Sequence, residues 1–183
     1  MTLTATQNLE NDHVHVLRLT DIMLKMVEKK AENVVHMELI VNLVRFFADG
    51  LHHAKEEDLL FPMLVKKGFS PEHGPVAVML AEHVLGRTYI RGVADGITAF
   101  KAGDRSALDA IYENLEEYAF LLNAHINKEN NILFRMADQA LSANDQSMLL
   151  AQFDDVEKHT EPAYQTANAV KSIDELASVY LKS

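Results

Sequence analysis

The chain has 183 residues, 48% apolar and 24% charged, which fits one compact soluble domain. Its 17 basic and 27 acidic residues give a net charge of −10, which argues against nucleic-acid or anionic-membrane partners. It has no cysteine, which excludes disulfides and thiolate sites. The N-terminus lacks the features of a signal peptide, and the longest apolar run, 76–81, is far below the roughly 20 residues of a membrane span. We therefore expect a cytoplasmic protein.

The chain is predicted to be all-α, because glycine and proline are few and Met, Leu, Ala and Glu are plentiful. The first helix is expected over about 8–30, with His13 on its apolar stripe. The second begins near Val34 and ends around Lys66-Lys67-Gly68, where cations precede a glycine stop. Pro62 falls inside its pattern and should kink the helix or end its regular part.

A turn-rich connection leads to a third helix over about 75–101, and the fourth holds one apolar face from Ile111 to Met136. A helical extension follows over about 142–183, with capping boxes predicted at Ser142 and Ser172. Short connections favour antiparallel neighbours. We therefore predict a single domain over 1–183, in which residues 8–140 form an up-down antiparallel four-helix bundle.

A twelve-residue segment that starts at His52 is repeated at His125, with six identical positions. The identical positions include His52/His125 and Glu56/Glu129. Residues four apart lie on one face of a helix, about 6 Å apart along its axis. Each copy therefore offers an imidazole and a carboxylate to the same point, and two copies predict a site with approximate two-fold symmetry that suits two metal ions.

The repeat extends one helix further back in each half. An acid, a histidine and a valine occur at 12–14 and again at 82–84, which adds His13 and His83 to the set. Unpaired carboxylates are almost never fully buried. Two inward carboxylates among four imidazoles, with no inward lysine in the pattern, therefore need a cation.

The donor types indicate which metal binds. Imidazole and carboxylate without thiolate suit iron, manganese or zinc. If both glutamates bridge two octahedral ions and an oxo or hydroxo group is shared, about two of roughly twelve coordination positions remain open for a small ligand. Zinc prefers four-coordinate sites, which favours iron.

This ordered set resembles the hemerythrin-like proteins of the bacterial His/His/Glu cation-binding type, over about residues 8–140. The resemblance implies a four-helix bundle with a non-haem di-iron (Fe-O-Fe) centre that reacts with dioxygen or related small molecules. The ligands that it implies are His13, His52, Glu56, His83, His125 and Glu129.

One departure from the oxygen-carrying hemerythrins bears on function. Those proteins have a second histidine on the third helix, four residues before or after the first. Here the two positions are Met79 and Arg87, so the pattern counts four histidines instead of five. An extra open position would favour water, peroxide or nitric oxide chemistry over simple oxygen carriage, unless a different fifth donor fills it.

Three further residues have two interpretations each. His53 and Glu57 follow ligands by one position, so they are either a solvated or interhelical polar pair, or they act as a partner of the ligands or an additional ligand. Tyr118 lies on the stripe of His125 and is either a core residue or a hydrogen-bond donor inside the metal cavity.

The leading functional hypothesis is a di-iron protein that binds or reacts with dioxygen, peroxide or nitric oxide, with weak peroxidase, catalase-like or oxidase activity as an open question. The expected partner is therefore a small gaseous or peroxide ligand. An alternative is an iron-handling or iron-sensing module whose fold the metal stabilises without turnover. A purely structural bundle is disfavoured by the inward carboxylates. Ferritin-like oxidases are disfavoured because they use Glu-x-x-His motifs.

Overall fold

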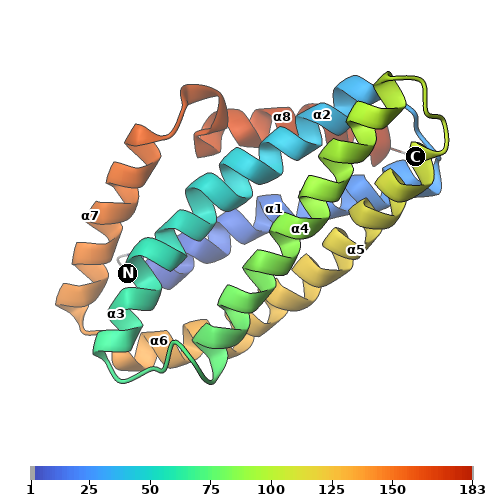
Figure 1. Ribbon diagram of the computed structural model, residues 1–183. Helices are drawn as coiled ribbons and strands as arrows, with labels where there is room; N and C mark the ends of the chain where they lie inside the picture. Colours follow the sequence, from blue (N-terminus) through green and yellow to red (C-terminus); the bar gives the residue numbers. More distant parts are fainter. Residues whose placement is uncertain (1–2, 183) are drawn as a thin grey trace.

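The computed structural model describes residues 3–182, and every regular element in that range is helical, as predicted. Four long rods account for most of it (Figure 1). The first rod is α1 (Ala5–Glu28), and the third is α4 (Pro75–Lys101). The second rod comprises α2 (Val34–Asn42), the π-helical segments η1 (Leu43–His53) and η2 (Glu56–Leu60), and α3 (Phe61–Lys66). The fourth comprises α5 (Ala107–Lys128), the π-helical η3 (Glu129–Leu133) and α6 (Phe134–Ala140).

Local sequence signals set several of these boundaries. The Thr4 side chain accepts the Gln7 N–H at 3.2 Å and caps α1. Gly68 follows α3 with φ 99°, a left-handed conformation that glycine adopts without steric cost. Pro62 lies in the first turn of α3, where its missing N–H costs little, so the rod continues through it.

The C-terminal extension contains α7 (Ala143–His159), the short 3₁₀ turn η4 (Pro162–Tyr164) and α8 (Thr166–Tyr180). The capping box at Ser142 is confirmed, since its side chain accepts the Asp145 N–H. The second predicted box was wrong, because α8 runs through Ser172. Burial of the apolar face of α8, which begins at Ala169, fixes the helix there and outweighs the local capping signal.

The rods pack around a core that has two parts. The third rod packs along α5, α1 packs along α5 and α8, and α2 packs against α4. One apolar cluster fills the end of the molecule that α8 covers, and the other fills the end that α7 covers. Between the clusters lies a layer of buried histidine and glutamate side chains. No helix among residues 3–182 has the length and apolar character needed to cross a membrane.

Candidate metal centre

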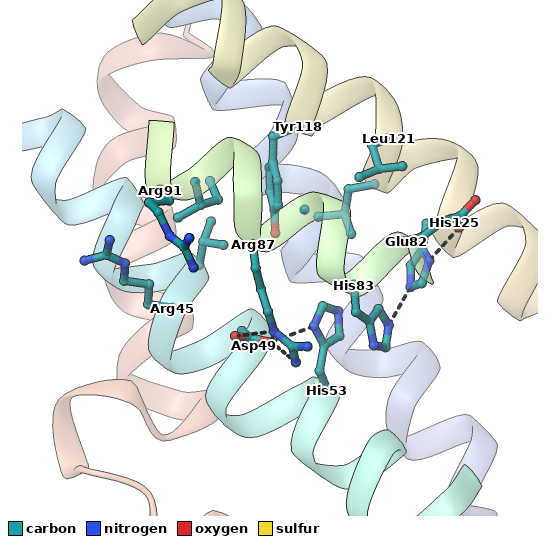
Figure 2. A pocket seen from close by; sticks show the side chains of 14 residues that line it. Arg45, Asp49, His53, Glu82, His83, Arg87, Arg91, Tyr118, Leu121 and His125 are labelled. Carbon is teal, nitrogen blue, oxygen red and sulfur yellow. Dashed lines mark hydrogen bonds and ion pairs between the residues drawn. The ribbon is translucent and has the colours of Figure 1, made fainter. Parts of the chain in front are cut away.

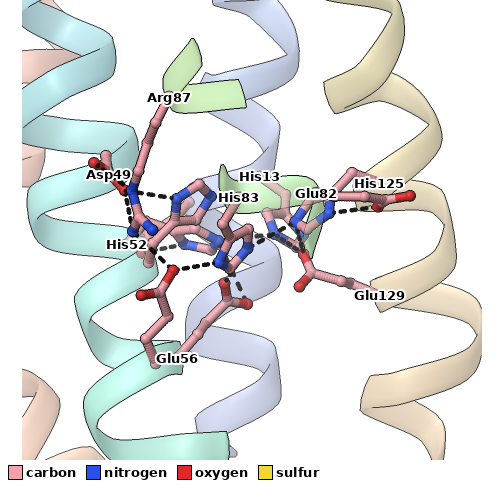
Figure 3. A network of polar contacts seen from close by, with 12 residues as sticks. His13, Asp49, His52, Glu56, Glu82, His83, Arg87, His125 and Glu129 are labelled. Atoms are coloured by element: carbon pink, nitrogen blue, oxygen red, sulfur yellow. Dashed lines mark hydrogen bonds and ion pairs between the residues drawn. The ribbon is translucent and has the colours of Figure 1, made fainter. Parts of the chain in front are cut away.

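The six side chains that the sequence pattern singles out meet in the layer between the two apolar clusters (Figure 3). Each rod supplies at least one of them. Both glutamates are 0% exposed, and no histidine of the set exceeds 2%. Within residues 3–182, three groups of closely spaced potential ligand atoms occur. One is formed by His13, His52, Glu56 and Glu129, the second by His53, Glu56, His83 and His125, and the third, beside the layer, by Asp49, His53 and Glu57.

The four predicted histidines form two pairs, one from each half of the sequence. The Nε2 atoms of His13 and His52 lie 3.0 Å apart, and those of His83 and His125 lie 3.1 Å apart. In all four rings the opposite nitrogen, Nδ1, faces a side-chain oxygen. With the proton on Nδ1, the Nε2 lone pairs point at one another inside the layer, an arrangement that a cation between them stabilises.

The two glutamates each contact one histidine from either half. Glu129 Oε2 lies 3.2 Å from His13 Nε2 and 3.3 Å from His125 Nε2. Glu56 lies 3.7 Å from His52 Nε2 through Oε1 and 3.6 Å from His83 Nε2 through Oε2. Both carboxylates therefore face imidazoles from the two halves of the sequence.

The burial of these carboxylates is only partly compensated: burial would raise the pKa of Glu129, but the adjacent His125 and His13 hold it well below its usual range. No group within residues 3–182 hydrogen-bonds to any of the four oxygens of Glu56 and Glu129. Burial raises the pKa of Glu56 well above its usual range, and the neighbouring Glu129 carboxylate raises it further. Burial lowers the pKa of His125, but the adjacent Glu129 and Glu82 carboxylates outweigh this effect and raise it. The layer thus favours positive charge at its centre, and its donors fit metal ions.

Outer side chains fix the four rings in a pattern that follows the sequence repeat. Asp12 and Glu82, which precede a histidine in each half, accept from the Nδ1 of His52 at 3.3 Å and of His125 at 2.9 Å. At matching positions of the doubled segment, Glu57 Oε1 lies 2.6 Å from His83 Nδ1, and Asn130 Oδ1 lies 2.7 Å from His13 Nδ1. Such partners orient metal-binding imidazoles and raise their basicity.

The repeated lysines complete this pattern. Lys55 donates to Asp12 at 2.9 Å, and Lys128 pairs with Glu82. Lys55 is only 3% exposed, so a lysine does lie inside this part of the molecule, contrary to the sequence-based expectation. Its ammonium pairs with Asp12 and donates also to Asn8, and neither inward glutamate is its partner.

His53 and Glu57 are not a solvated pair. His53 is 6% exposed and stacks on His83, with ring centroids 3.7 Å apart. Its Nδ1 lies 3.1 Å from Asp49 Oδ1, and Arg87 donates to Asp49 at 2.7 to 3.1 Å and to Glu57 at 2.8 Å. Arg87, at a position where the oxygen carriers place a histidine, thus holds the acceptors of two imidazoles.

A cavity of about 260 Å³ opens beside this network, between η1, α4 and α5 (Figure 2). Its inner wall includes His53, His83 and His125, and its outer part is lined by arginine side chains. Tyr118 extends from α5 into the cavity, and burial raises the pKa of its hydroxyl, which therefore stays a donor. This placement favours the interpretation of Tyr118 as a hydrogen-bond donor inside the cavity.

Several members of the network were not assigned a role from sequence. The repeat contained the signal for most of them, since Asp12/Glu82, Lys55/Lys128 and the sixth position of each doubled segment recur at constant offsets. Asp49 carried no such signal, because Leu122 stands at its repeat position and the Arg87–Asp49 contact joins different rods.

A helical fold with imidazoles and carboxylates clustered in its interior is typical of metal-binding proteins. The sequence model of the hemerythrin HHE cation-binding domain matches residues 4–137, and the chain belongs to this family.

Curated relatives that the chain resembles include iron–sulfur cluster repair proteins YtfE. Those of Yersinia pestis (strain Pestoides F) and Yersinia pseudotuberculosis (serotype O:1b, strain IP 31758) are both 35% identical over 89 residues. The match covers 47% of this chain but only 40% of either relative. No solved structure shows a significant match.

Proposed function

We propose that the protein is a non-haem di-iron protein that binds or reacts with dioxygen, peroxide or nitric oxide. The observation that carries this proposal is the set of four buried carboxylate oxygens that no hydrogen bond satisfies within residues 3–182, facing four imidazole Nε2 atoms. Two divalent ions would neutralise the carboxylates and use the nitrogen lone pairs. His13, His52, Glu56, His83, His125 and Glu129 would hold them.

Several features support iron over the alternatives. The donors are nitrogen and oxygen only, in a number that suits two six-coordinate ions better than four-coordinate zinc. The curated relatives are named for iron–sulfur cluster repair. We also propose that the four rods form the up-down antiparallel bundle of the family and that the protein works in the cytoplasm.

Iron bound in this layer would supply redox chemistry and open positions for small ligands. The residues of the chain determine access and polarity. The cavity leads from the surface to His53, His83 and His125, so a small molecule has a route to that side. Tyr118 can donate a hydrogen bond along it, and the Arg87–Asp49 ion pair keeps its wall polar.

The test follows the spectrum of the iron-loaded protein after anaerobic reduction and addition of one oxidant at a time. A stable, reversible dioxygen adduct indicates carriage or sensing. Rapid oxidation coupled to peroxide consumption indicates turnover. The proposal fails if reduced, iron-loaded protein shows no spectral response to dioxygen, peroxide or nitric oxide.

A second candidate is an iron-handling module in which the metal stabilises the fold without turnover, and the name of the relatives favours it. Metal that binds only the folded state at 100 times its dissociation constant adds about 2.7 kcal/mol of stability. Melting with and without iron, combined with an assay of peroxide decay, separates the candidates. A large metal-dependent shift with no peroxide decay supports the iron-handling module.

A further inference from the structure

His53 occupies a ligand-like position although it is not one of the four repeated histidines. One of its ring nitrogens lies within 4.8 Å of ligand atoms of Glu56, His83 and His125. The ring is nearly parallel to His83, with 14° between the planes, and it is buried. It therefore belongs to a group of potential ligand atoms with Glu56, His83 and His125, and also to one with Asp49 and Glu57. Because imidazole lone pairs lie in the ring plane, the stacked His53 ring must turn for its nitrogen and that of His83 to face one ion.

The hydrogen bonding of His53 matches that of the four predicted ligands. Its Nδ1 faces a carboxylate, Asp49, at 3.1 Å, and Asp49 is in turn held by Arg87. With Asp49 as the acceptor, the His53 proton lies on Nδ1 and Nε2 keeps a lone pair.

The π-helical winding of η1 explains how two consecutive residues can both serve the site. Successive side chains on an α-helix are about 100° apart, which would turn His53 away from the face of His52. A π-helical turn closes over one more residue, so the rotation per residue is smaller. Gly50 permits this winding, since a Cβ there would lie 3.1 Å from the Arg45 carbonyl oxygen.

The sequence repeat shows that this arrangement is not needed to build the fold. The repeat positions of Asp49, His53 and Arg87 in the other half carry aliphatic side chains that pack in the core. His53 is buried, while Asp49 and Arg87 are partly exposed, and a buried imidazole is costly to maintain where an aliphatic residue packs equally well. Its presence in only one half of the repeat indicates a function in the metal site. The aliphatic counterparts are Leu122, Ile126 and Leu17.

We propose that His53 is the fifth nitrogen donor of the centre, joining His83 and His125 at one metal position while His13 and His52 serve the other. This inference rests on the proposed di-iron function. It gives the protein five histidines at the site, but the fifth comes from the second rod. Arg87, at the third-rod position, orients the new donor through Asp49.

The experiment compares wild-type protein with His53→Phe and His53→Ala. Phenylalanine keeps a ring against His83 but offers no nitrogen, and alanine leaves space beside the cavity. His159→Ala is the matched control, because His159 is exposed and bonds only to the Asp155 carbonyl in the described chain. Iron content, competition with a chelator and the nitrogen count from X-ray absorption are measured for each.

Both His53 variants are expected to stay helical and to bind one iron about 10-fold more weakly or worse. The nitrogen count should fall, and added imidazole should restore the wild-type spectrum of His53→Ala. His53 is not a donor if both variants keep two irons at wild-type affinity with an unchanged nitrogen count. Wild-type protein that fails to bind two irons overturns the di-iron function itself, and with it this proposal.

Discussion

The two halves of the repeat, α1 with the second rod and α4 with the fourth, share one set of residues and differ in another. Each half supplies two histidines, one inward glutamate, one acid and one lysine at matching positions. They differ around the cavity, where the polar trio Asp49, His53 and Arg87 replaces aliphatic side chains. The shared residues supply the ligands of the proposed metal site, and the differing residues give this layer one accessible, polar side.

The largest effect is expected from Glu56→Gln or Glu129→Gln, which test the shared set. Either change should weaken iron binding by roughly 100-fold or more, beyond the range seen for outer partners. Glu56→Gln should also raise the stability of the metal-free protein, since a buried carboxylate that accepts no hydrogen bond is lost. Melting with and without iron measures both effects. If only one of the two substitutions weakens iron binding, the two halves of the repeat do not supply equivalent glutamate ligands.

The outer acceptors provide the next test. Asp12→Asn and Glu82→Gln should each lower iron affinity by about 10- to 100-fold, because each loosens a histidine of one half. Equal losses are expected from the two variants in a chelator competition. Glu10→Gln is a suitable control, since Glu10 pairs with Arg135 away from the layer. Wild-type affinity in both variants would contradict the role of these acceptors.

A substitution at Gly86 tests the role of the cavity, which is present in only one half of the repeat. A Cβ at this position would lie 3.3 Å from the Tyr118 ring, so Gly86→Ala should narrow the cavity and cost about 1–3 kcal/mol of stability. Iron content should not change, but the reaction with peroxide or nitric oxide should slow.

The matched control for Gly86 is Val16→Ala, at the repeat position in the other half. Loss of its buried methyl groups should cost roughly 2 kcal/mol without slowing the reaction. Equal reaction rates for Gly86→Ala and wild type would show that the cavity is not the route of entry.

The sequence predicted the residues that the two halves of the repeat share better than the residues in which the halves differ. Helical periodicity indicated the rods. The doubled segment, together with the repeated acid, histidine and valine one helix back, identified six residues that the fold brings together, because these signals are local or repeated. The sequence left His53 open between a polar pair, a partner of the ligands and an additional donor, because regular α-helical geometry was assumed where η1 is π-helical. The extent of α8 was missed because its start depends on tertiary burial from Ala169 onward.

The smallest effect is expected outside both halves, at Asp145. Hydrogen bonds from Lys67 and from Ser142 lower its pKa to about 2. A carboxyl with a lowered folded-state pKa adds stability above its unfolded value of about 3.9, and this contribution is lost as the pH falls toward 2. Asp145→Asn should therefore lower the melting temperature slightly at pH 7, with a difference that disappears near pH 2. Iron content should remain that of wild type.

The most direct test of the central claim is an anaerobic titration of metal-free protein with ferrous iron, monitored by bound iron and repeated for His52→Ala and His125→Ala. A di-iron centre predicts an end point at two irons per chain in wild type. Each variant removes a ligand from a different half and should bind iron more weakly. An end point at one iron, or variants that titrate like wild type, would contradict it.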